Sequence, residues 1–378
     1  MLRVGLPLLL ACAAAAWVFV RGLKPTSNTW HLSGPRLLEG KEAVLEARRR
    51  SLTPEERKAD PLHLAVHPDL VWSKKHWSRH VFIHGSVGSG KTQILLPLIQ
   101  QLLDQDQKLF LYDVKGDFTQ AFRQPIIVSP FDKRSYVWDI GRDVRTPTQA
   151  AAFAASLIPE DTGNGKFWTI AAQQLLTGSV RSLQNTKGTE WGWKDLAEAV
   201  SRGAQDMLPV IREHYSKAAP LIANADSQST ASVLATLAGY TRVIDDLALA
   251  WPERTERAFA MTDWIQDDYQ GRKQVIVQAG PDAQLTRAYI SAMLNVAVPS
   301  IISPALGDNE EGRTLAFILD ELPSLGVINL PQLVDLGRSK GVVVVAACQD
   351  LGQLKMVYGE HQGKGLPSTA ATRIVCQV

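Results

Sequence analysis

The fold is decided by residues 81–92, which run Val-Phe-Ile-His-Gly-Ser-Val-Gly-Ser-Gly-Lys-Thr. A short run with strand character enters a glycine-rich loop, and residues 93–96 (Gln-Ile-Leu-Leu) continue as a helix. The order of strand, GxxxxGKT loop and helix predicts a phosphate-binding P-loop. The alternative is a glycine-rich turn that matches by accident, which average residue usage makes about a 1% event.

Each part of this loop has a chemical role. The glycines let backbone N–H groups approach phosphate oxygens, and the helix start adds its positive dipole end. Lys91 is expected to reach the β- and γ-phosphates, and the Thr92 hydroxyl to ligate Mg²⁺. The predicted nucleotide-binding residues of the loop are therefore Gly85, Ser86, Val87, Gly88, Ser89, Gly90, Lys91 and Thr92.

The composition limits the classes of function. The chain has 378 residues, of which 45% are hydrophobic and 21% charged, so a large core and more than one domain are expected. A formal net charge of +2 excludes a basic nucleic-acid arm, and any DNA contact would come from local patches. The three cysteines have no metal-ligand spacing and fit a reduced, cytosolic compartment.

The first residues differ from the rest. Residues 4–20 carry no charge, and this run of 17 residues is at the short end of what spans a bilayer. Basic residues follow it, which favours a transmembrane helix with a cytoplasmic body. A cleaved signal peptide at the alanine-rich residues 11–16 and a lipoprotein site at residues 9–12 are alternatives. Both would export a nucleotide site to where ATP is absent. Residues 1–24 are therefore predicted as a membrane anchor and residues 25–75 as a juxtamembrane connector.

The connector is expected to be polar, with an amphipathic helix over residues 41–50 and a short helix that Thr53-Pro54 begins. Strands are expected at 108–112 and 126–128 after the P-loop helix. Polar Asp113 and Lys115 follow the first of these strands, where they would face a ligand crevice or form a local ion pair. Residues 76–146 are predicted as the first segment of a nucleotide-binding domain.

An all-α inserted domain is predicted over residues 147–270, because no strand candidate is found between residue 147 and about residue 267. Helices are expected at 147–158, 166–183, 193–200, 207–222 and 230–249. Its aromatic residues are expected in the core rather than on a base-stacking surface: Phe153, Phe167, Trp168, Trp191 and Trp193. Residues 271–378 are predicted as the second segment of the nucleotide domain. Its strands are expected at 274–279, 314–319, 342–347 and 372–376, and its helices at 283–298 and 333–339.

Asp320 and Glu321 predict the second half of a hydrolytic site. An aspartate at the end of an apolar strand next to the P-loop strand holds Mg²⁺ through water, and an adjacent glutamate polarises the attacking water. Gln349 ends the next strand. Its side-chain amide is expected to contact the γ-phosphate or to hold that water, and the alternative is an exposed loop amide. Arg338 ends a helix, either complementing the helix dipole or acting as an arginine finger in a neighbouring subunit.

These residues resemble the TraD/TraG-type coupling proteins of type IV secretion and conjugation systems, over roughly residues 30–378. The resemblance rests on Arg79-His80, on Tyr112-Asp-Val-Lys-Gly-Asp117, on Pro130-Phe-Asp132, on the helical insertion, on Asp320-Glu-Leu-Pro-Ser-Leu-Gly326, on Gly337-Arg338 and on Cys348-Gln349.

The resemblance implies an ATP hydrolase that uses ATP and Mg²⁺. The implied fold is an α/β, RecA-like P-loop NTPase with a mostly parallel sheet, an inserted all-α domain and an N-terminal transmembrane helix. It also implies a homo-hexamer at the bacterial inner membrane, single-pass here, with the ATPase domain in the cytoplasm. Such a hexamer couples a relaxase–DNA complex to type IV secretion channel components and translocates single-stranded DNA during conjugation.

By position, the resemblance assigns roles to individual residues. Lys91 matches the Walker A lysine, and Asp320 with Glu321 the Walker B pair. The sensor glutamine is matched by Gln349, the finger acting on a neighbour by Arg338, and a basic residue at the nucleotide site by Arg79.

Two departures and three alternatives accompany the resemblance. Members usually carry two transmembrane helices, and their nucleotide domain continues beyond the equivalent of residue 378, so a short or truncated member is expected. The alternative functions are an FtsK/HerA-like double-stranded DNA pump, a coupling ATPase for protein effectors, and a non-hydrolysing adaptor that recruits relaxosome proteins through its helical domain.

Overall fold

The computed structural model describes residues 12–15, 17, 37–252, 255–310 and 312–376. Most of the predicted anchor lies outside these described residues. The chain divides into two compact units, residues 1–50 and 51–378. In the first unit, helix α2 (Gly40–Arg50) confirms the helix expected there, and it has no buried residue. The sheet and the helices around it belong to the second unit.

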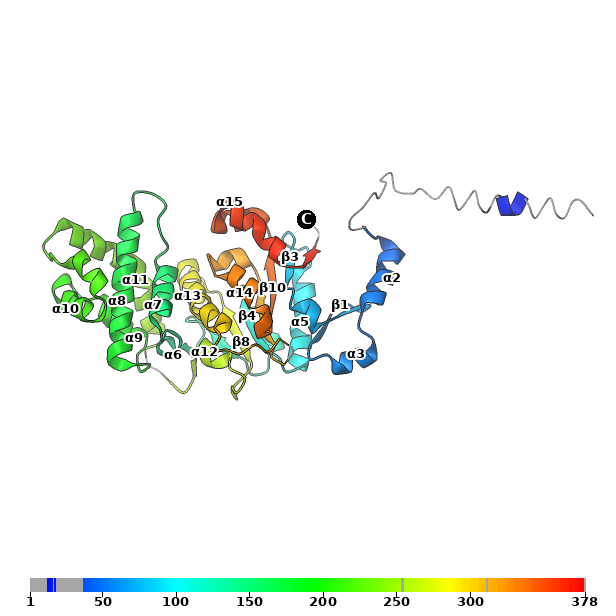
Figure 1. The fold of residues 1–378 in the computed structure, drawn as a ribbon, viewed down its shortest axis with the longest axis horizontal. Helices are drawn as coiled ribbons and strands as arrows, with labels where there is room; N and C mark the ends of the chain where they lie inside the picture. Colours follow the sequence, from blue (N-terminus) through cyan, green and yellow to red (C-terminus); the bar gives the residue numbers. More distant parts are fainter. Residues whose placement is uncertain (1–11, 16, 18–36, 253–254, 311, 377–378) are drawn as a thin grey trace, which may run out of the picture. The chain divides into compact units, whose positions relative to one another are not determined.

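A seven-stranded sheet forms the centre of residues 51–378, and all of its strand pairs are parallel (Figure 1). The order across the sheet is β11-β3-β10-β9-β4-β8-β5. Because the strands run in one direction, all their carboxyl ends lie at one edge, here called the carboxyl edge. The strands are β3 (Val81–His84), β4 (Lys108–Asp113), β5 (Ile126–Val128), β8 (Gln274–Gln278), β9 (Leu315–Leu319), β10 (Val342–Cys348) and β11 (Thr372–Val375).

The strand order corrects one expectation. The strand that ends at Asp320 was predicted to lie next to the P-loop strand, but β10 lies between β3 and β9. The register pairs Val345 of β10 with Val81 on one side and with Ile318 on the other. Apolar strand sequences indicate burial without indicating which strand pairs with which. The ends of β3 and β9 are thus two strand spacings apart, roughly 10 Å.

One face of the sheet is covered by α5 (Lys91–Asp104) and by a hairpin that the sequence analysis missed. The apolar stripe of α5 packs on this face through Leu95, Leu98, Ile99 and Leu102. Strands β1 (His63–His67) and β2 (Leu70–Ser73) pair antiparallel, and α4 (Lys74–Trp77) follows them. Leu64 and Trp77 join the same core cluster. The last part of the expected polar connector is therefore packed, and its strands of four and five residues were too short for a clear alternation.

The opposite face is covered by α7 (Pro147–Leu157), α13 (Ala283–Ile302) and α14 (Leu330–Leu336). Figure 1 shows α5 on one side of the sheet and α13 and α14 on the other. Within the described residues, α13 is the one helix long and apolar enough to cross a membrane, but 78% of that apolar window is buried. Its length and hydropathy are therefore accounted for by a core position.

The stretch in which a helical insertion is expected consists mainly of helices. Figure 1 shows α8, α10 and α11 beyond α7 and α13, on the side away from the sheet. The expected helix over 207–222 is broken at Tyr215 into two segments. The helices are α8 (Lys166–Lys187), α9 (Trp193–Val200), α10 (Ala204–His214), η2 (Ser216–Ile222) and α11 (Gln228–Ala250). One cluster of buried side chains runs from these helices to the sheet, so the two share a continuous core.

Two details of the insertion differ from expectation. A two-residue strand, β7 (Ala258–Phe259), pairs with β6 (Val137–Trp138) and joins the two ends of the insertion, where no strand was predicted. A strand of two residues leaves no alternation to detect. Phe167 is 55% exposed, so its expected core position is wrong, whereas Phe153 and Trp193 are buried and their ring centroids lie 6.1 Å apart.

Candidate active site

The P-loop joins β3 to α5, as the sequence predicts. Gly88 and Gly90 have φ angles of 78° and 94°, and a Cβ at either position would meet no atom within 4 Å. These two positions therefore favour glycine because of backbone conformation. Gly85 favours it for another reason, because a Cβ there would lie 2.5 Å from the Ser89 Oγ and 2.6 Å from the Cys376 Cβ.

Two polar groups of the loop fit a bound phosphate. The Lys91 Nζ donates to the carbonyl oxygens of Gly85 at 2.5 Å and Ser86 at 3.0 Å, so the ammonium folds back over the loop. The Ser89 Oγ is buried and has no hydrogen-bond partner among the described residues. A buried hydroxyl without a partner is costly, and an anionic acceptor at the loop would satisfy it. The cradle therefore fits the phosphates of a nucleotide.

Asp320 and Glu321 follow β9 at the carboxyl edge. Glu321 is one of three non-glycine residues with positive φ among the described residues, with φ 66° and ψ 62°. Its carbonyl oxygen accepts hydrogen bonds from Ser324 N at 3.0 Å and Ser324 Oγ at 2.7 Å. The short helix η3 (Leu322–Leu325) follows directly. A strained residue held by such a turn is typical of a functional site.

Unbalanced negative charge gathers at this position. Burial, and after it the neighbouring Glu321 and Asp113 carboxylates, raises the pKa of Asp320 to about 6. Burial also raises the pKa of Glu321, against hydrogen bonds from Gln349 that lower it. The positive charges of Lys115 and Lys91 oppose both increases. Buried carboxylates that repel one another are a suitable place for a divalent cation.

The described residues contain no group of three or more His, Cys, Asp or Glu side chains placed to hold a metal ion. Mg²⁺ bound with a nucleotide takes few protein ligands, because phosphates and water supply the rest. The candidate protein ligands are Asp320 and Thr92. Thr92 is exposed in the first turn of α5, next to Lys91.

Gln349 joins the site from β10. The register places Cys348 opposite His84, and the Gln349 N donates to the Glu321 Oε1 at 3.4 Å. The structure therefore brings the P-loop, the acidic pair and Gln349 together at the carboxyl edge. Three segments that lie far apart in the sequence meet here because the strands are parallel.

Arg338 and Arg79 do not join this site within one chain. Arg79 lies just before β3 and six positions before Gly85, or roughly 20 Å of extended chain. Arg338 begins η4 (Arg338–Lys340), just before β10, and its Nε lies 3.0 Å from the Glu310 Oε1. Both arginines are at the amino edge of the sheet, opposite the P-loop. The expectation that Arg79 lies at the nucleotide site is wrong for the site of its own chain.

Sequence reasoning gave no role in the site to Tyr112 and left the role of Asp113 open. The Tyr112 Oη lies 2.7 Å from the Ser324 Oγ and so links the end of β4 to the turn that holds Glu321. Asp113 was left between two interpretations, and the structure shows a turn-forming role. Its carboxylate accepts from Gly116 N at 2.8 Å and from Phe118 N at 3.2 Å. The spacing of Asp113 and Gly116 is a turn signal that could have indicated this role.

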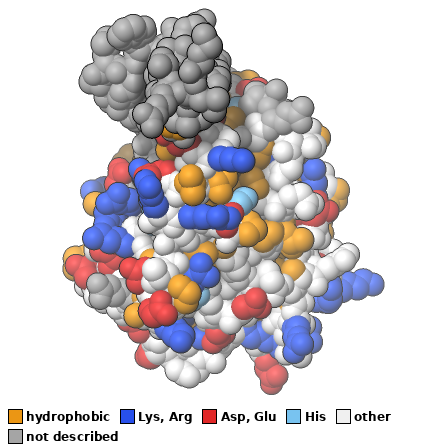
Figure 2. Space-filling view, turned by 90° about the vertical axis from the view of Figure 1, so that its right-hand side faces the viewer, with side chains coloured by type: hydrophobic (Ala, Val, Ile, Leu, Met, Phe, Trp, Pro, Cys, Tyr) orange, Lys and Arg blue, Asp and Glu red, His pale blue; other side chains and the backbone are white. Residues whose placement is uncertain are grey.

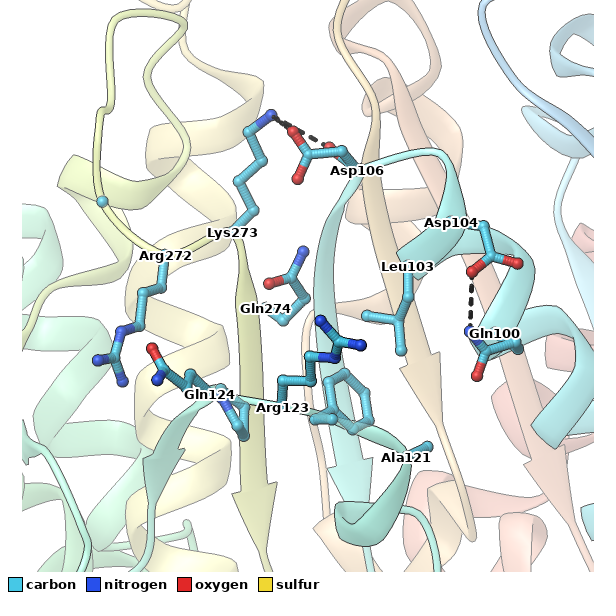
Figure 3. A pocket seen from close by; sticks show the side chains of 13 residues that line it. Gln100, Leu103, Asp104, Asp106, Ala121, Arg123, Gln124, Arg272, Lys273 and Gln274 are labelled. Carbon is cyan, nitrogen blue, oxygen red and sulfur yellow. Dashed lines mark hydrogen bonds and ion pairs between the residues drawn. The ribbon is translucent and has the colours of Figure 1, made fainter.

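A cavity of about 790 Å³ lies elsewhere. It is at the amino edge of β5 and β8, beside the end of α5 (Figure 3). Lys273 pairs there with Asp106, and Gln100 donates to the Asp104 Oδ1 at 2.8 Å. The cavity is therefore separate from the P-loop. On the face drawn in Figure 2, basic and acidic side chains are interspersed, in agreement with the low net charge.

The chain is similar to proteins of known families. The profile of a family described as the type IV secretion-system coupling protein DNA-binding domain matches residues 65–378. The coupling protein TraD of Escherichia coli (strain K12) is 25% identical over 300 residues, covering 77% of this chain. The chain spans 40% of the length of that protein.

Solved structures show the same fold. The conjugative coupling protein TrwBdeltaN70 in complex with sulphate matches with a TM-score of 0.75 and 21% identity, covering 93% of this chain and 80% of that one. TrwB in complex with ADP and Mg²⁺ matches with a TM-score of 0.71 and 20% identity, covering 87% and 75%. VirB4 of Thermoanaerobacter pseudethanolicus is more distant, with a TM-score of 0.54, 13% identity and coverage of 84% of each chain.

Proposed function

This chain belongs to the type IV secretion-system coupling protein DNA-binding domain family, and from that premise we propose that it is the ATP-hydrolysing part of a conjugative coupling protein. The observation that carries the proposal is the meeting of P-loop, acidic pair and glutamine at one sheet edge. The Gln349 N to Glu321 Oε1 contact at 3.4 Å and the influence of the Lys91 charge on Asp320 support it.

The proposed cofactors are ATP and Mg²⁺. Structures of the relative TrwB are described with ADP and Mg²⁺ and with a non-hydrolysable ATP analogue. Here the loop N–H groups, Ser89 and Lys91 would hold the phosphates, and Thr92 with Asp320 would hold the metal. When bound, Mg²⁺ neutralises charge on the β- and γ-phosphates.

The chain's own residues account for the remaining chemistry. Lys91 already points its ammonium at carbonyl oxygens of the loop, from which it would turn to phosphate oxygens. Glu321 orients the attacking water and accepts its proton, because its carboxylate lies where the acidic turn meets β10. Gln349 donates to that carboxylate and fixes its position.

Completion of the site would come from a second copy. Arg338 is at the opposite edge from the P-loop, so an arginine finger could reach a nucleotide only from a neighbouring subunit. Arg79 lies at the same amino edge and would approach from the same side. We therefore propose a ring, as a homo-hexamer, in which the amino edge of one chain faces the carboxyl edge of the next.

The proposal also covers the domains, the cargo and the location of the ATPase. Residues 76–146 and 271–378 are proposed as the nucleotide domain, with residues 147–270 as an inserted helical domain that meets the cargo. The proposed cargo is single-stranded DNA with its relaxase and relaxosome proteins, delivered to the components of a type IV secretion channel. Residues 1–24 are proposed to anchor the chain in the bacterial inner membrane with the ATPase in the cytoplasm.

ATP turnover of the full chain tests the proposal. Lys91→Ala and Glu321→Gln are expected to lower turnover by a factor of about 100 or more, since each removes a group that acts on phosphate or water. Lys217→Ala, an exposed lysine in η2, is the matched control and should behave as the wild type. Hydrolysis by both site variants at the wild-type rate would contradict an ATPase and favour a recruitment adaptor.

Three DNA conditions identify the cargo. Single-stranded oligonucleotide is expected to stimulate turnover more than duplex of the same length, and no added DNA should give the lowest rate. Stronger stimulation by duplex would favour a double-stranded DNA pump. Equal turnover in all three conditions would favour a coupling ATPase for protein effectors.

A further inference from the structure

An acidic segment of the chain lies against the arginine proposed as the finger. We call residues 307–310 (Gly-Asp-Asn-Glu) the acidic clasp. It connects α13 to β9 and faces η4, which contains Arg338, Ser339 and Lys340. The inference below rests on the proposed role of Arg338.

The clasp contacts every residue of η4. The Glu310 Oε1 accepts from the Arg338 Nε at 3.0 Å. The Asp308 Oδ1 lies 3.0 Å from the Ser339 Oγ and 2.8 Å from the Lys340 Nζ. The backbone joins as well, because the Asn309 N donates to the Ser339 carbonyl oxygen at 2.9 Å. Such residue-by-residue pairing fixes the clasp opposite η4.

The part of the contact around Lys340 is closely packed. Lys340 is 7% exposed, and its Nζ also donates to the Leu306 carbonyl oxygen at 2.5 Å. Arg313, which is 6% exposed, holds both oxygens of Asp267 at 2.7 Å. Gly341 has φ 76°, and a Cβ there would lie 1.9 Å from the Arg313 carbonyl oxygen. Close packing and the buried Lys340 and Arg313 side chains therefore hold this end of the clasp in place.

The part of the contact formed by Arg338 and Glu310 is accessible to solvent. The Arg338 and Glu310 side chains are 42% and 38% exposed. Both residues line a cavity of about 610 Å³, so the guanidinium has room to leave Glu310 without moving the backbone. A half-exposed pair of single charges is weak, whereas several charged oxygens of a polyphosphate offer a guanidinium more than one carboxylate does.

We propose that Glu310 holds the Arg338 guanidinium within its own chain, and that the guanidinium leaves Glu310 when a neighbouring copy presents a bound nucleotide. Glu310 is thus a positioning residue that withholds the finger until the ring is assembled and loaded. Asp308 and the buried cations keep η4 in place while the guanidinium turns. The ion pair with Glu310 therefore opposes the transfer of Arg338 to the neighbouring site and holds turnover below the level that a released Arg338 would support.

Turnover of the full chain, measured per protomer across a range of protein concentrations, tests the proposal. Glu310→Gln keeps the shape of the side chain but removes its charge, so a two- to five-fold gain in turnover is expected at limiting concentration, as for loss of a weak ion pair. Glu46→Gln removes the charge from a matched Glu–Arg pair, with the Arg50 Nε at 2.9 Å, and should change nothing. Equal melting temperatures of the two variants and the wild type would exclude a general structural effect.

A double variant shows whether the gain depends on the finger. Glu310→Gln combined with Arg338→Ala is expected to be as slow as Arg338→Ala alone. A gain that persists without Arg338, or unchanged or lower turnover in Glu310→Gln, overturns the proposed restraint. Arg338→Ala alone distinguishes failure of the proposed restraint from failure of the proposed finger. Full activity of that single variant overturns the finger itself.

Discussion

At the residue scale, the chemistry of the site explains which residues could be predicted. The P-loop requires glycine, lysine and a hydroxyl at fixed spacing, so Lys91 and Thr92 could be predicted from the sequence alone. Asp320 and Glu321 could be predicted in the same way, because two carboxylates at the end of a buried strand indicate a functional role. The crowding at Gly85 against Cys376 could not be predicted, because the two residues meet only when β11 pairs with β3.

Asp320 is expected to destabilise the chain at neutral pH when no metal is bound. Its pKa is about 6 in the folded chain, against 3.8 for an ordinary aspartate, so the folded state holds the proton more tightly. The stability that this proton contributes is complete below pH 3.8 and is lost as pH rises through 6. Asp320→Asn, which carries no charge at any pH, should therefore raise the free energy of unfolding at pH 8 by about 3 kcal/mol.

Urea denaturation of the nucleotide-free chain at pH 5 and pH 8 measures this effect. The gain from Asp320→Asn should be smaller at pH 5, where the wild-type carboxyl is already largely protonated. Asp117→Asn, an exposed neighbour on the same edge, is the control and should show no such difference. An equal gain at both pH values would mean that the pKa of Asp320 is not raised in the folded chain.

At the element scale, strands and helices with a long hydrophobic pattern could be predicted, and short or cross-connected elements could not. The pattern over α11 and the buried run of β10 are unambiguous because each is long for its type. The pairs β1–β2 and β6–β7 have strands of two to five residues, and their existence depends on contacts distant in sequence. The order of β3, β10 and β9 likewise depends on how the connecting helices cross the sheet, which no local pattern records.

His80 joins three elements at the amino edge. It has φ 63° and is buried; its Nδ1 accepts from Val344 N of β10 at 3.1 Å, and its Nε2 lies 3.0 Å from the Val334 carbonyl oxygen of α14. His80→Ala would leave both backbone groups buried without partners, so a loss of about 2–4 kcal/mol in unfolding free energy is expected. His361→Ala, on an exposed face of α15 (Leu351–Thr369), should cost little.

The pH dependence of His80 gives a second readout. Burial lowers the pKa of His80 from 6.5 to about 4, so the unfolded chain binds the proton first as pH falls. Stability from this residue is present above pH 6.5 and is lost as the pH decreases toward 4. The difference in melting temperature between wild type and His80→Ala should therefore shrink between pH 7 and pH 4. A constant difference would show that the imidazole does not have to be neutral to hold α14 against β10.

At the scale of the whole molecule, one chain carries the two halves of the proposed hydrolytic site at opposite edges of the sheet. The P-loop, acidic pair and Gln349 are at the carboxyl edge, while Arg338 and Arg79 are at the amino edge. A sequence motif carries no information about which edge a residue occupies until the strand direction and order are known. That is why the roles of the arginines could be proposed from the sequence but their distance from the nucleotide could not.

Mixing two inactive variants tests whether the P-loop and the arginine of one working site come from different chains. Lys91→Ala lacks a working P-loop but keeps its arginine, and Arg338→Ala lacks the arginine but keeps its P-loop. In rings formed by random mixing of equal amounts, one interface in four would combine an intact P-loop with an intact arginine. Turnover should therefore recover to about a quarter of the wild-type value, as expected for a finger supplied by a neighbour. If both groups served the nucleotide of their own chain, no mixed ring would contain an intact site, and the mixture would stay as inactive as its components.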